Sequence, residues 1–287
     1  MGSTQKAIAY RHVSKAYLPA RRGGPVPALE DISFEVSEGE FISVVGPSGC
    51  GKTTLLKMTC GLTLPSDGEI RIGGVPVREP VTGIGFIFQT PLLCPWRRII
   101  DNVLLPVEML GLRKEDYREE ALRLLNLVGL EGFESRYPFE LSGGMQQRVS
   151  LARCLIRDPP IMLMDEPFGS VDALTRDQLD LELLRIHRAK GKTIVFVTHS
   201  IMEATLLADR IVVLGPRPGR VRGVIEIGLP RPRGIDVMTT QEFAAYVGCI
   251  RNLVGENGQG EGRGLICPVN PPEEEARDRG ANRRLGR

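Results

Sequence analysis

The stretch GPSGCGKTT follows the apolar run FISVV and contains three glycines, a lysine and two threonines. Its spacing fits the pattern G-x-x-x-x-G-K-[ST]. In this pattern the glycines let backbone N–H groups surround a phosphate, the lysine adds charge for the β and γ phosphates, and the hydroxyl is a ligand for Mg²⁺. A helix that starts here adds its positive dipole end. The predicted nucleotide-binding residues are Gly46, Pro47, Ser48, Gly49, Cys50, Gly51, Lys52, Thr53 and Thr54.

Two acids and a histidine follow other apolar runs. IMLMDEP ends near Asp165 and Glu166, and TIVFVTH ends at His199. Because a parallel sheet gathers the carboxyl ends of its strands at one edge, these side chains are expected near the phosphate loop. Asp165 suits water-mediated coordination of Mg²⁺, and Glu166 could polarise a water that attacks a γ-phosphate. The pattern therefore indicates nucleotide hydrolysis.

A second anion-binding pattern lies in LSGGMQQRVSLARCLIRDP. Ser142 stands at the N-cap of the helix expected there, and Gly143 and Gly144 expose backbone N–H groups. The chain thus contains a second anion site in addition to its phosphate loop.

The elements that must position these residues can be predicted from periodicity. KAIAYRHV and LEDISFEVSEGEFISVVG are typical of strands, while PIMLMDEP and KTIVFVTH are continuous apolar runs, as in parallel strands buried on both faces. Between the last two, a helix is expected with Leu179, Leu183 and Ile186 on one stripe and Gly191 as its stop. Strand, helix and strand in succession predict an α/β core.

The rest of the chain divides into three parts. Residues 100–157 carry helical periodicity, with a stripe from Tyr117 to Val128, and are predicted to form a helical lobe inserted into the core. DRIVVLGPRPGRVRGVIEIGLP indicates two strands around a Pro/Gly turn. Residues 1–254 are taken as one domain. Residues 255–287 are rich in Gly, Pro and charge and are predicted to be a disordered tail.

Composition limits the possible functions. The 37 basic and 35 acidic residues nearly balance, which argues against a nucleic-acid partner. The six cysteines have no C-x-x-C pair, so free thiols in a reducing compartment are expected. No run approaches the roughly 18–20 apolar residues of a membrane span, and MGSTQKAIAY has no apolar core of a secretory signal. Any membrane contact is therefore expected to go through a partner.

Taken together, the motifs from about Ile8 to Val254 resemble the ATP-binding cassette of ABC transporters. The resemblance implies an α/β P-loop NTPase fold: a mostly parallel RecA-like core sheet, an N-terminal antiparallel β subdomain and an inserted helical subdomain. It implies ATP hydrolysis with Mg²⁺, and a head-to-tail homodimer that holds two ATP molecules between its protomers. Ser142 and the following glycines of one chain would bind the γ-phosphate held by the loop of the other.

The resemblance also implies roles for single residues. Glu166, His199 and Gln89 would be catalytic, and Gln89 would sense Mg²⁺ and water and link the site to the membrane partner. The Mg²⁺ ligands would be Thr53, Gln89 and Asp165. Asp172 would couple the two sites across the interface. Tyr17 would stack on adenine, with packing as the alternative for an aromatic near a strand end.

One departure narrows the resemblance. Met145 stands where many cassettes have Gln, and this variant resembles the nitrate/sulfonate/taurine (bicarbonate) branch of importers, as do FQTPLLCPWRRIIDNVLLPVEMLG and GPRPGRV. The branch implies a peripheral subunit on the cytoplasmic face of the inner membrane, bound to transmembrane permease subunits and through them to an external solute-binding protein. Residues 90–103 would take the permease's coupling helix, with Trp96 and Leu93 as candidate contacts. The solute stays open.

Rival classes of protein fit less well. A cassette ATPase of DNA repair or chromosome structure needs a long coiled-coil insertion, and a translation factor of this kind usually carries two cassettes. A small-molecule kinase would lack the LSGG helix. The remaining alternative is a cassette ATPase with a regulatory, non-transport role.

Overall fold

Continuous apolar runs form the centre of the fold, a six-stranded sheet. The computed structural model describes residues 6–18, 24–169 and 171–255. The order of the strands is β10–β9–β3–β8–β7–β6, and all neighbours are parallel except the edge strand β10. The strands are β3 (Phe41–Val45), β6 (Ile84–Ile87), β7 (Ile161–Asp165), β8 (Thr193–Val197), β9 (Arg210–Leu214) and β10 (Val221–Glu226). Because β3, β8, β7 and β6 are neighbours, the loops that follow them meet at one edge.

The core strands are buried on both faces, as their unbroken apolar sequences predict. Alternate residues point to opposite sides. Phe41 and Phe196 contribute to one hydrophobic cluster, which includes the helices of the lobe and the C-terminal helices. Ile42 and Val197 contribute to the other cluster, with Leu55 of α1 (Lys52–Thr59). The sheet therefore separates two cores.

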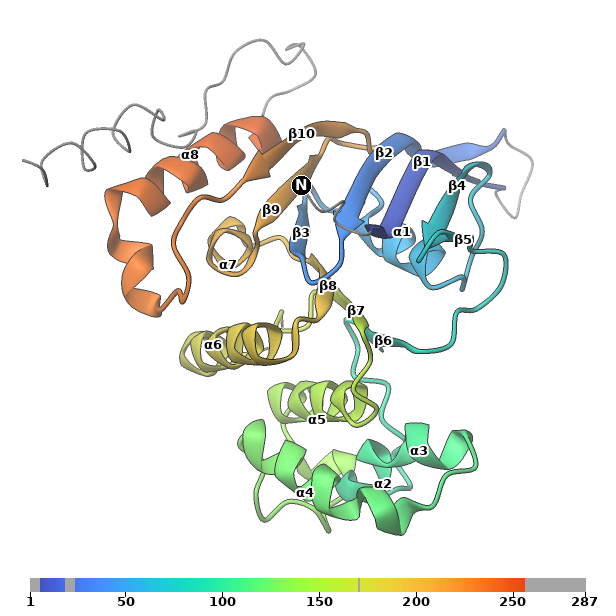
Figure 1. The fold of residues 1–287 in the computed structure, drawn as a ribbon, viewed down its shortest axis with the longest axis vertical. Helices are drawn as coiled ribbons and strands as arrows, with labels where there is room; N and C mark the ends of the chain where they lie inside the picture. Colours follow the sequence, from blue (N-terminus) through green and yellow to red (C-terminus); the bar gives the residue numbers. More distant parts are fainter. Residues whose placement is uncertain (1–5, 19–23, 170, 256–287) are drawn as a thin grey trace, which may run out of the picture.

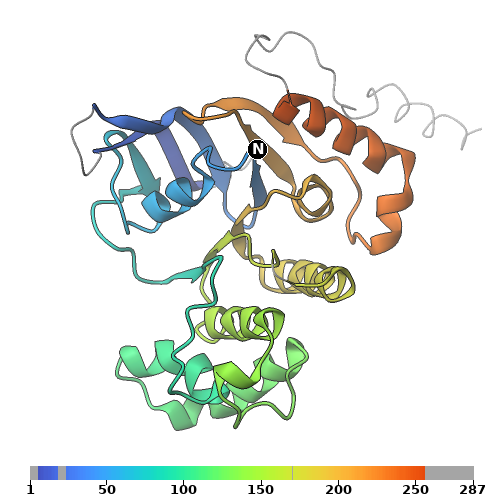
Figure 2. The ribbon, with the colours of Figure 1, turned by 180° about the vertical axis from the view of Figure 1, so that it is seen from behind.

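A second, antiparallel sheet packs over the second core. Its order is β2–β1–β4–β5, built from β1 (Lys6–Tyr17), β2 (Val26–Ser37), β4 (Asp67–Ile72) and β5 (Val75–Pro76). This sheet and the helical lobe lie at opposite ends of the molecule (Figures 1 and 2). The expected N-terminal antiparallel subdomain is thus confirmed.

The helical lobe lies between β6 and β7 in the sequence. It contains α2 (Ile99–Val103), α3 (Leu105–Met109), η1 (Lys114–Tyr117), α4 (Arg118–Leu127), η2 (Pro138–Glu140) and α5 (Gly143–Leu155). The predicted stripe faces inward, since Ala121, Leu124, Leu125 and Val128 are all buried. Tyr117 is only partly buried and packs against the same cluster.

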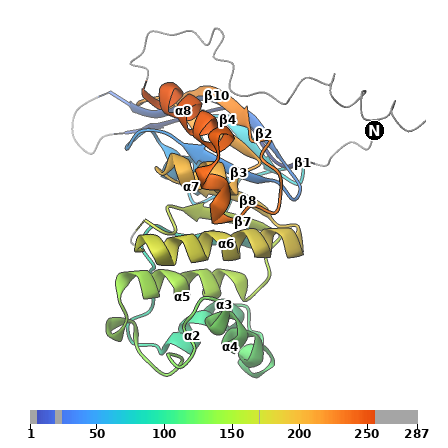
Figure 3. The same ribbon diagram turned by 90° about the vertical axis from the view of Figure 1, so that its left-hand side faces the viewer.

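Three further helices and a short 3₁₀ turn complete the fold. They are α6 (Ala173–Lys190), α7 (Ile201–Leu207), η3 (Ile235–Thr239) and α8 (Gln241–Gly255). Helix α6 stops at Gly191, whose φ of 57° is left-handed, as expected of a C-terminal glycine. Helix α8, which was not predicted, runs alongside β10 (Figures 1 and 3). Of the predicted tail, only Gly255 is described, as the last residue of α8; the rest lies outside the described residues.

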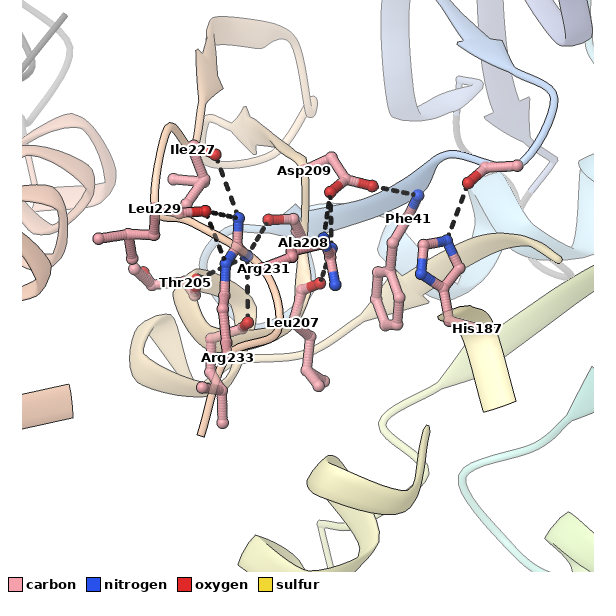
Figure 4. A network of polar contacts seen from close by, with 12 residues as sticks. Phe41, His187, Thr205, Leu207, Ala208, Asp209, Ile227, Leu229, Arg231 and Arg233 are labelled. Atoms are coloured by element: carbon pink, nitrogen blue, oxygen red, sulfur yellow. Dashed lines mark hydrogen bonds and ion pairs between the residues drawn. The ribbon is translucent and has the colours of Figure 1, made fainter. Parts of the chain in front are cut away.

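A buried arginine ties the C-terminal segment to the core (Figure 4). Arg233 is 6% exposed and makes no ion pair among the described residues. Instead, its guanidinium donates to the backbone carbonyls of Thr205, Leu206, Ala208, Ile227 and Leu229. These include the last carbonyls of α7, which have no partner within the helix. Nearby, Arg231 pairs with Asp209, whose other oxygen accepts from the Phe41 N–H at 2.9 Å.

Two further expectations concern membranes and thiols. Among the described residues, no helix is both long enough and apolar enough to cross a bilayer. Cys50, Cys60, Cys94 and Cys154 are free thiols. Cys249 is disulfide-bonded, so the expectation of free thiols throughout is wrong there. Cys267 lies outside the described residues.

Candidate nucleotide site

The phosphate loop connects β3 to α1 and has no space for side chains at two of its glycines. Gly51 has a φ of 105°, and a Cβ on it would lie 2.6 Å from Leu29 Cδ2. A Cβ on Gly46 would lie 2.7 Å from the Leu214 carbonyl oxygen. Glycine is therefore needed here for packing as well as for conformation. The loop leads directly into α1, whose first backbone N–H groups are available to an anion.

Lys52 is buried beside the loop that it follows. Its exposed fraction is 6%, and Nζ donates to the carbonyls of Gly46 at 2.9 Å and Pro47 at 3.1 Å. These bonds hold the ammonium against the turn instead of letting it extend into water. A positive charge is thus fixed within the loop, as a phosphate site requires.

Thr53 of α1 and Asp165 at the end of β7 come together at this edge of the sheet. Thr53 Oγ1 donates to Asp165 Oδ1 at 3.1 Å, and Asp165 is buried at the end of β7. Burial raises the pKa of Asp165, and the neighbouring Glu166 charge adds to this, while the Thr53 hydrogen bond opposes it. A hydroxyl beside a carboxylate is a donor set of the kind that Mg²⁺ prefers. The residues present therefore fit the ion that the sequence implies.

The three predicted catalytic residues lie together, because Gln89 and His199 both contact Glu166. Its Oε2 lies 3.1 Å from His199 Nδ1 and 3.4 Å from Gln89 Nε2. Gln89 follows β6, Glu166 follows β7, and His199 follows β8. The φ of Glu166 is +45°, an unusual value for a residue other than glycine, and such backbone strain is concentrated at functional sites.

Tyr17 lies at the side of the same loop. Its hydroxyl is 3.3 Å from Thr54 Oγ1, and Lys15 Nζ lies 5.3 Å from the centre of its ring. The residue is 41% exposed, so the ring is not buried in a core. This exposure favours the stacking hypothesis over packing.

Ser142 and Asp172 do not reach the phosphate loop of their own chain. Ser142 caps α5 and accepts from the Met145 N–H at 3.3 Å, and Gly143 and Gly144 form the first turn of that helix. Asp172 caps α6 and accepts from the Thr175 N–H at 3.0 Å, which holds its pKa below the usual value. Within the described ranges, no hydrogen bond or ion pair joins these residues to positions 46–54.

Side chains of helix α5 hydrogen-bond to the backbone of the segment that carries Gln89, a contact that the sequence did not reveal. Gln147 Nε2 donates to the Phe88 carbonyl at 3.0 Å. Arg153 donates to the Leu92 carbonyl at 2.8 Å and also to that of Pro91. With Ser150, which donates to the Pro91 carbonyl, these polar residues recur every three positions along α5, a detectable pattern, but their partners lie about 60 residues away. Helix α5, which begins in the LSGG stretch, is thus connected to the Gln89 segment by hydrogen bonds.

The predicted permease contacts differ in their exposure. Trp96 is 76% exposed, which suits a docking residue better than a core residue. Leu93 is partly buried and packs against the core of the lobe. Cys50 has a fully buried side chain, and burial raises the pKa of its thiol. The nucleotide would therefore meet the backbone of Cys50.

The chain is similar to known proteins over most of its length. The family model "ABC transporter" matches residues 29–169. A taurine import ATP-binding protein of Jannaschia sp. is 46% identical over 75% of this chain and 80% of its own. An aliphatic sulfonates import ATP-binding protein of Bacillus cereus is 43% identical over 84% of this chain and 94% of its own.

A solved structure agrees with these relatives. The ATP-binding cassette MJ0796, a dimer in a post-hydrolysis state bound to ADP and Pi, superposes with a TM-score of 0.71 at 32% identity. The match covers 78% of this chain and 100% of that one, which confirms the predicted cassette fold. From its phosphate loop, its signature helix and these relatives, the chain belongs to the family of ABC transporter ATP-binding proteins.

Proposed function

We propose that this chain is the ATP-hydrolysing subunit of an ABC importer that energises uptake of a small anion or organosulfur solute. The solute would resemble taurine, an alkanesulfonate or nitrate. The proposal of ATP hydrolysis depends on one observation: Gln89 and His199 contact the same oxygen of Glu166, beside the phosphate loop. The relatives named for taurine and sulfonate import support the importer branch. They also disfavour a regulatory ATPase without a transport partner.

The loop residues 46–54 would bind the phosphates of ATP, and Tyr17 would stack on the adenine. Thr53, Asp165 and Gln89 would hold Mg²⁺, which when bound supplies positive charge at the β- and γ-phosphates. Lys52 would leave the loop carbonyls to contact the γ-phosphate.

Glu166 would act as the general base. It takes a proton from a water whose oxygen bonds to the γ-phosphorus, while the bond from that phosphorus to the bridging oxygen breaks and ADP leaves with the electron pair. His199, on the same carboxylate, would orient Glu166 and stabilise the charge that develops on the phosphate. Gln89 would orient the water.

A head-to-tail dimer would supply the second anion site. Ser142, Gly143 and Gly144 of one protomer would face the γ-phosphate held by the loop of its partner, and Asp172 would connect the two sites. The separation of these residues from their own loop and the dimers of MJ0796 both support this arrangement.

The dimer would bind permease subunits at the cytoplasmic face of the inner membrane, and the permease would receive solute from an external binding protein. The formal net charge of +2 gives no reason to expect a nucleic-acid partner.

The transport role can be tested in cells that lack this chain. Uptake of radiolabelled taurine, an alkanesulfonate and nitrate should be lost for one of the three and restored by the wild-type chain but not by Lys52→Ala. A tagged chain should also co-purify from membranes with a multi-span permease. Normal uptake of every solute, together with purification free of membrane protein, would favour the regulatory alternative.

A further inference from the structure

A buried polar cluster lies directly behind His199 and has no part in the roles described above. Helices α6 and α7 lie against each other (Figure 3), and each contributes a carboxyl side chain to the cluster. Asp180 on α6 is 2% exposed and Glu203 on α7 is 6% exposed. Carboxyl groups are rarely buried so completely unless they are paired.

Glu203 is connected to His199 through the backbone. Thr198, the residue before His199, donates a hydrogen bond from its hydroxyl to Glu203 Oε2. The same hydroxyl accepts from the Ser200 N–H at 3.0 Å, and Ser200 Oγ accepts from the Glu203 N–H at 3.3 Å. On one side of His199, Thr198 is therefore held directly by the carboxylate, and on the other side Ser200 is held by the Thr198 hydroxyl and by the backbone N–H of Glu203. His199 itself is exposed and contacts Glu166 at 3.1 Å.

The charges in the cluster do not balance unless one carboxyl keeps its proton. Arg176 lies near both carboxyls and His199 lies near Glu203, whereas Asp177 and Glu166 are further negative neighbours. Two buried carboxylates beside one guanidinium would leave an uncompensated charge, which burial makes costly. Burial raises the pKa of Glu203, which nevertheless accepts the Thr198 hydrogen bond. Burial and Glu203 raise the pKa of Asp180 to about 9, and Asp180 Oδ1 has no hydrogen-bond partner among the described residues.

We propose that Glu203, which is bonded to Thr198, is a positioning residue for His199, with Arg176 and a protonated Asp180 as its neighbours. The two helices thereby control the contact between His199 and Glu166. The same cluster reaches the other end of the site, because Arg176 also donates to the Val171 carbonyl at 2.8 Å, next to Asp172. Loss of the Asp180 proton would place a second negative charge beside Glu203 and push α6 and α7 apart.

This inference rests on the proposed hydrolysis, and its kinetic test uses the full-length chain with Mg-ATP. Glu203→Ala should lower kcat by roughly 10- to 100-fold, the scale of a misplaced catalytic group, with KM for ATP within about twofold. Glu203→Gln, which can still accept from Thr198, should recover most of the loss. If Glu203→Ala leaves kcat unchanged, or if Glu203→Gln is as impaired as Glu203→Ala, the positioning role is wrong.

The pH profile tests the proton on Asp180. In the wild type, kcat should fall above about pH 9, and in Asp180→Asn this alkaline limb should disappear while kcat at pH 7.5 is retained. Asp177→Asn, one turn of backbone away and only partly buried, is the matched control and should keep the alkaline limb. An identical limb in the wild type and Asp180→Asn would overturn the proposal.

A spectroscopic readout separates this inference from the proposed function. The chain has three histidines, so the ring signals of labelled protein can be resolved by NMR. The chemical shift of His199 should show an inflection near pH 9 that Asp180→Asn abolishes. The exposed His12 should show no inflection near pH 9 in either protein. An inflection that persists in Asp180→Asn contradicts the inference. If the purified chain hydrolysed no ATP, the proposed function would be contradicted, but this NMR titration could still be interpreted.

Discussion

At the scale of single residues, Glu166 is the side chain on which the hydrolytic proposal depends. Glu166→Gln keeps the size of the side chain but cannot accept a proton from water. We expect ATP turnover to fall by roughly 10² to 10⁴, the usual effect of removing a general base. We also expect an ATP-bound dimer to accumulate, which size-exclusion chromatography with Mg-ATP would detect. Glu131→Gln, at an exposed position, is the control and should behave as the wild type. Persistent turnover in a protein that stays monomeric would contradict the assignment.

Lys52 supports a second prediction at this scale. Lys52→Ala removes the charge that the loop carbonyls hold in place, so nucleotide binding should be lost. Lys57→Ala on the same helix is the matched control, because Lys57 is exposed and its charge lies outside the loop. Titration with a fluorescent ATP analogue measures both. Near-normal affinity in Lys52→Ala would argue against the phosphate site.

At the scale of elements, the Arg233 contacts predict how strongly the C-terminal segment is held. Arg233→Leu leaves several buried carbonyls at the end of α7 without a donor. The free energy of unfolding should therefore fall by about 3 kcal/mol or more, as when buried charge-assisted bonds are lost. Urea denaturation measures the change. Arg220→Leu, which breaks an exposed ion pair with Glu30, should lower the free energy of unfolding far less. Equal losses in the two variants would show that the buried contacts contribute no more than a surface pair.

The buried Asp180 predicts how stability depends on pH. Its pKa is raised from 3.8 to about 9 in the folded protein, so the folded state binds a proton that the unfolded state releases between these values. The stability that this group contributes is present at low pH and is lost as pH rises through that interval, by up to about 1.4 kcal/mol per unit. Asp180→Asn should be stabilised relative to the wild type, increasingly from pH 6 to 9. Urea unfolding at each pH would refute this if the difference stayed constant.

At the scale of the whole molecule, the proposed head-to-tail dimer can be tested with two inactive variants. Lys52→Ala disables the phosphate loop, and Ser142→Glu should repel the γ-phosphate while still capping α5. In a mixed dimer, one of the two sites would combine an intact loop with an intact Ser142. Equal mixing should restore about a quarter of wild-type turnover, because half of the dimers are mixed and each has one intact site. No recovery on mixing would mean that loop and Ser142 act within one chain.

Much of the candidate site was predictable because its residues follow strands that can be recognised from short stretches of sequence. An apolar run followed by glycines, acids or a histidine identifies a strand end, and a parallel sheet brings such ends together. The Arg233 contacts were missed because an arginine that binds backbone carbonyls has no sequence pattern of its own. The hydrogen bond from Gln147 to the Phe88 carbonyl was missed because its two partners lie 59 positions apart in the sequence.

By itself, the sequence determined that the chain has a phosphate loop, a separate Ser142 helix, and acids and a histidine at strand ends, because these features depend on residue types at short spacing. Only the tertiary structure decided which of them touch. It brought His199 and Gln89 to the same oxygen of Glu166 and buried Asp180 with Glu203. Desolvation and charge balance depend on neighbours far apart in the chain, so packing alone settles where a proton is held.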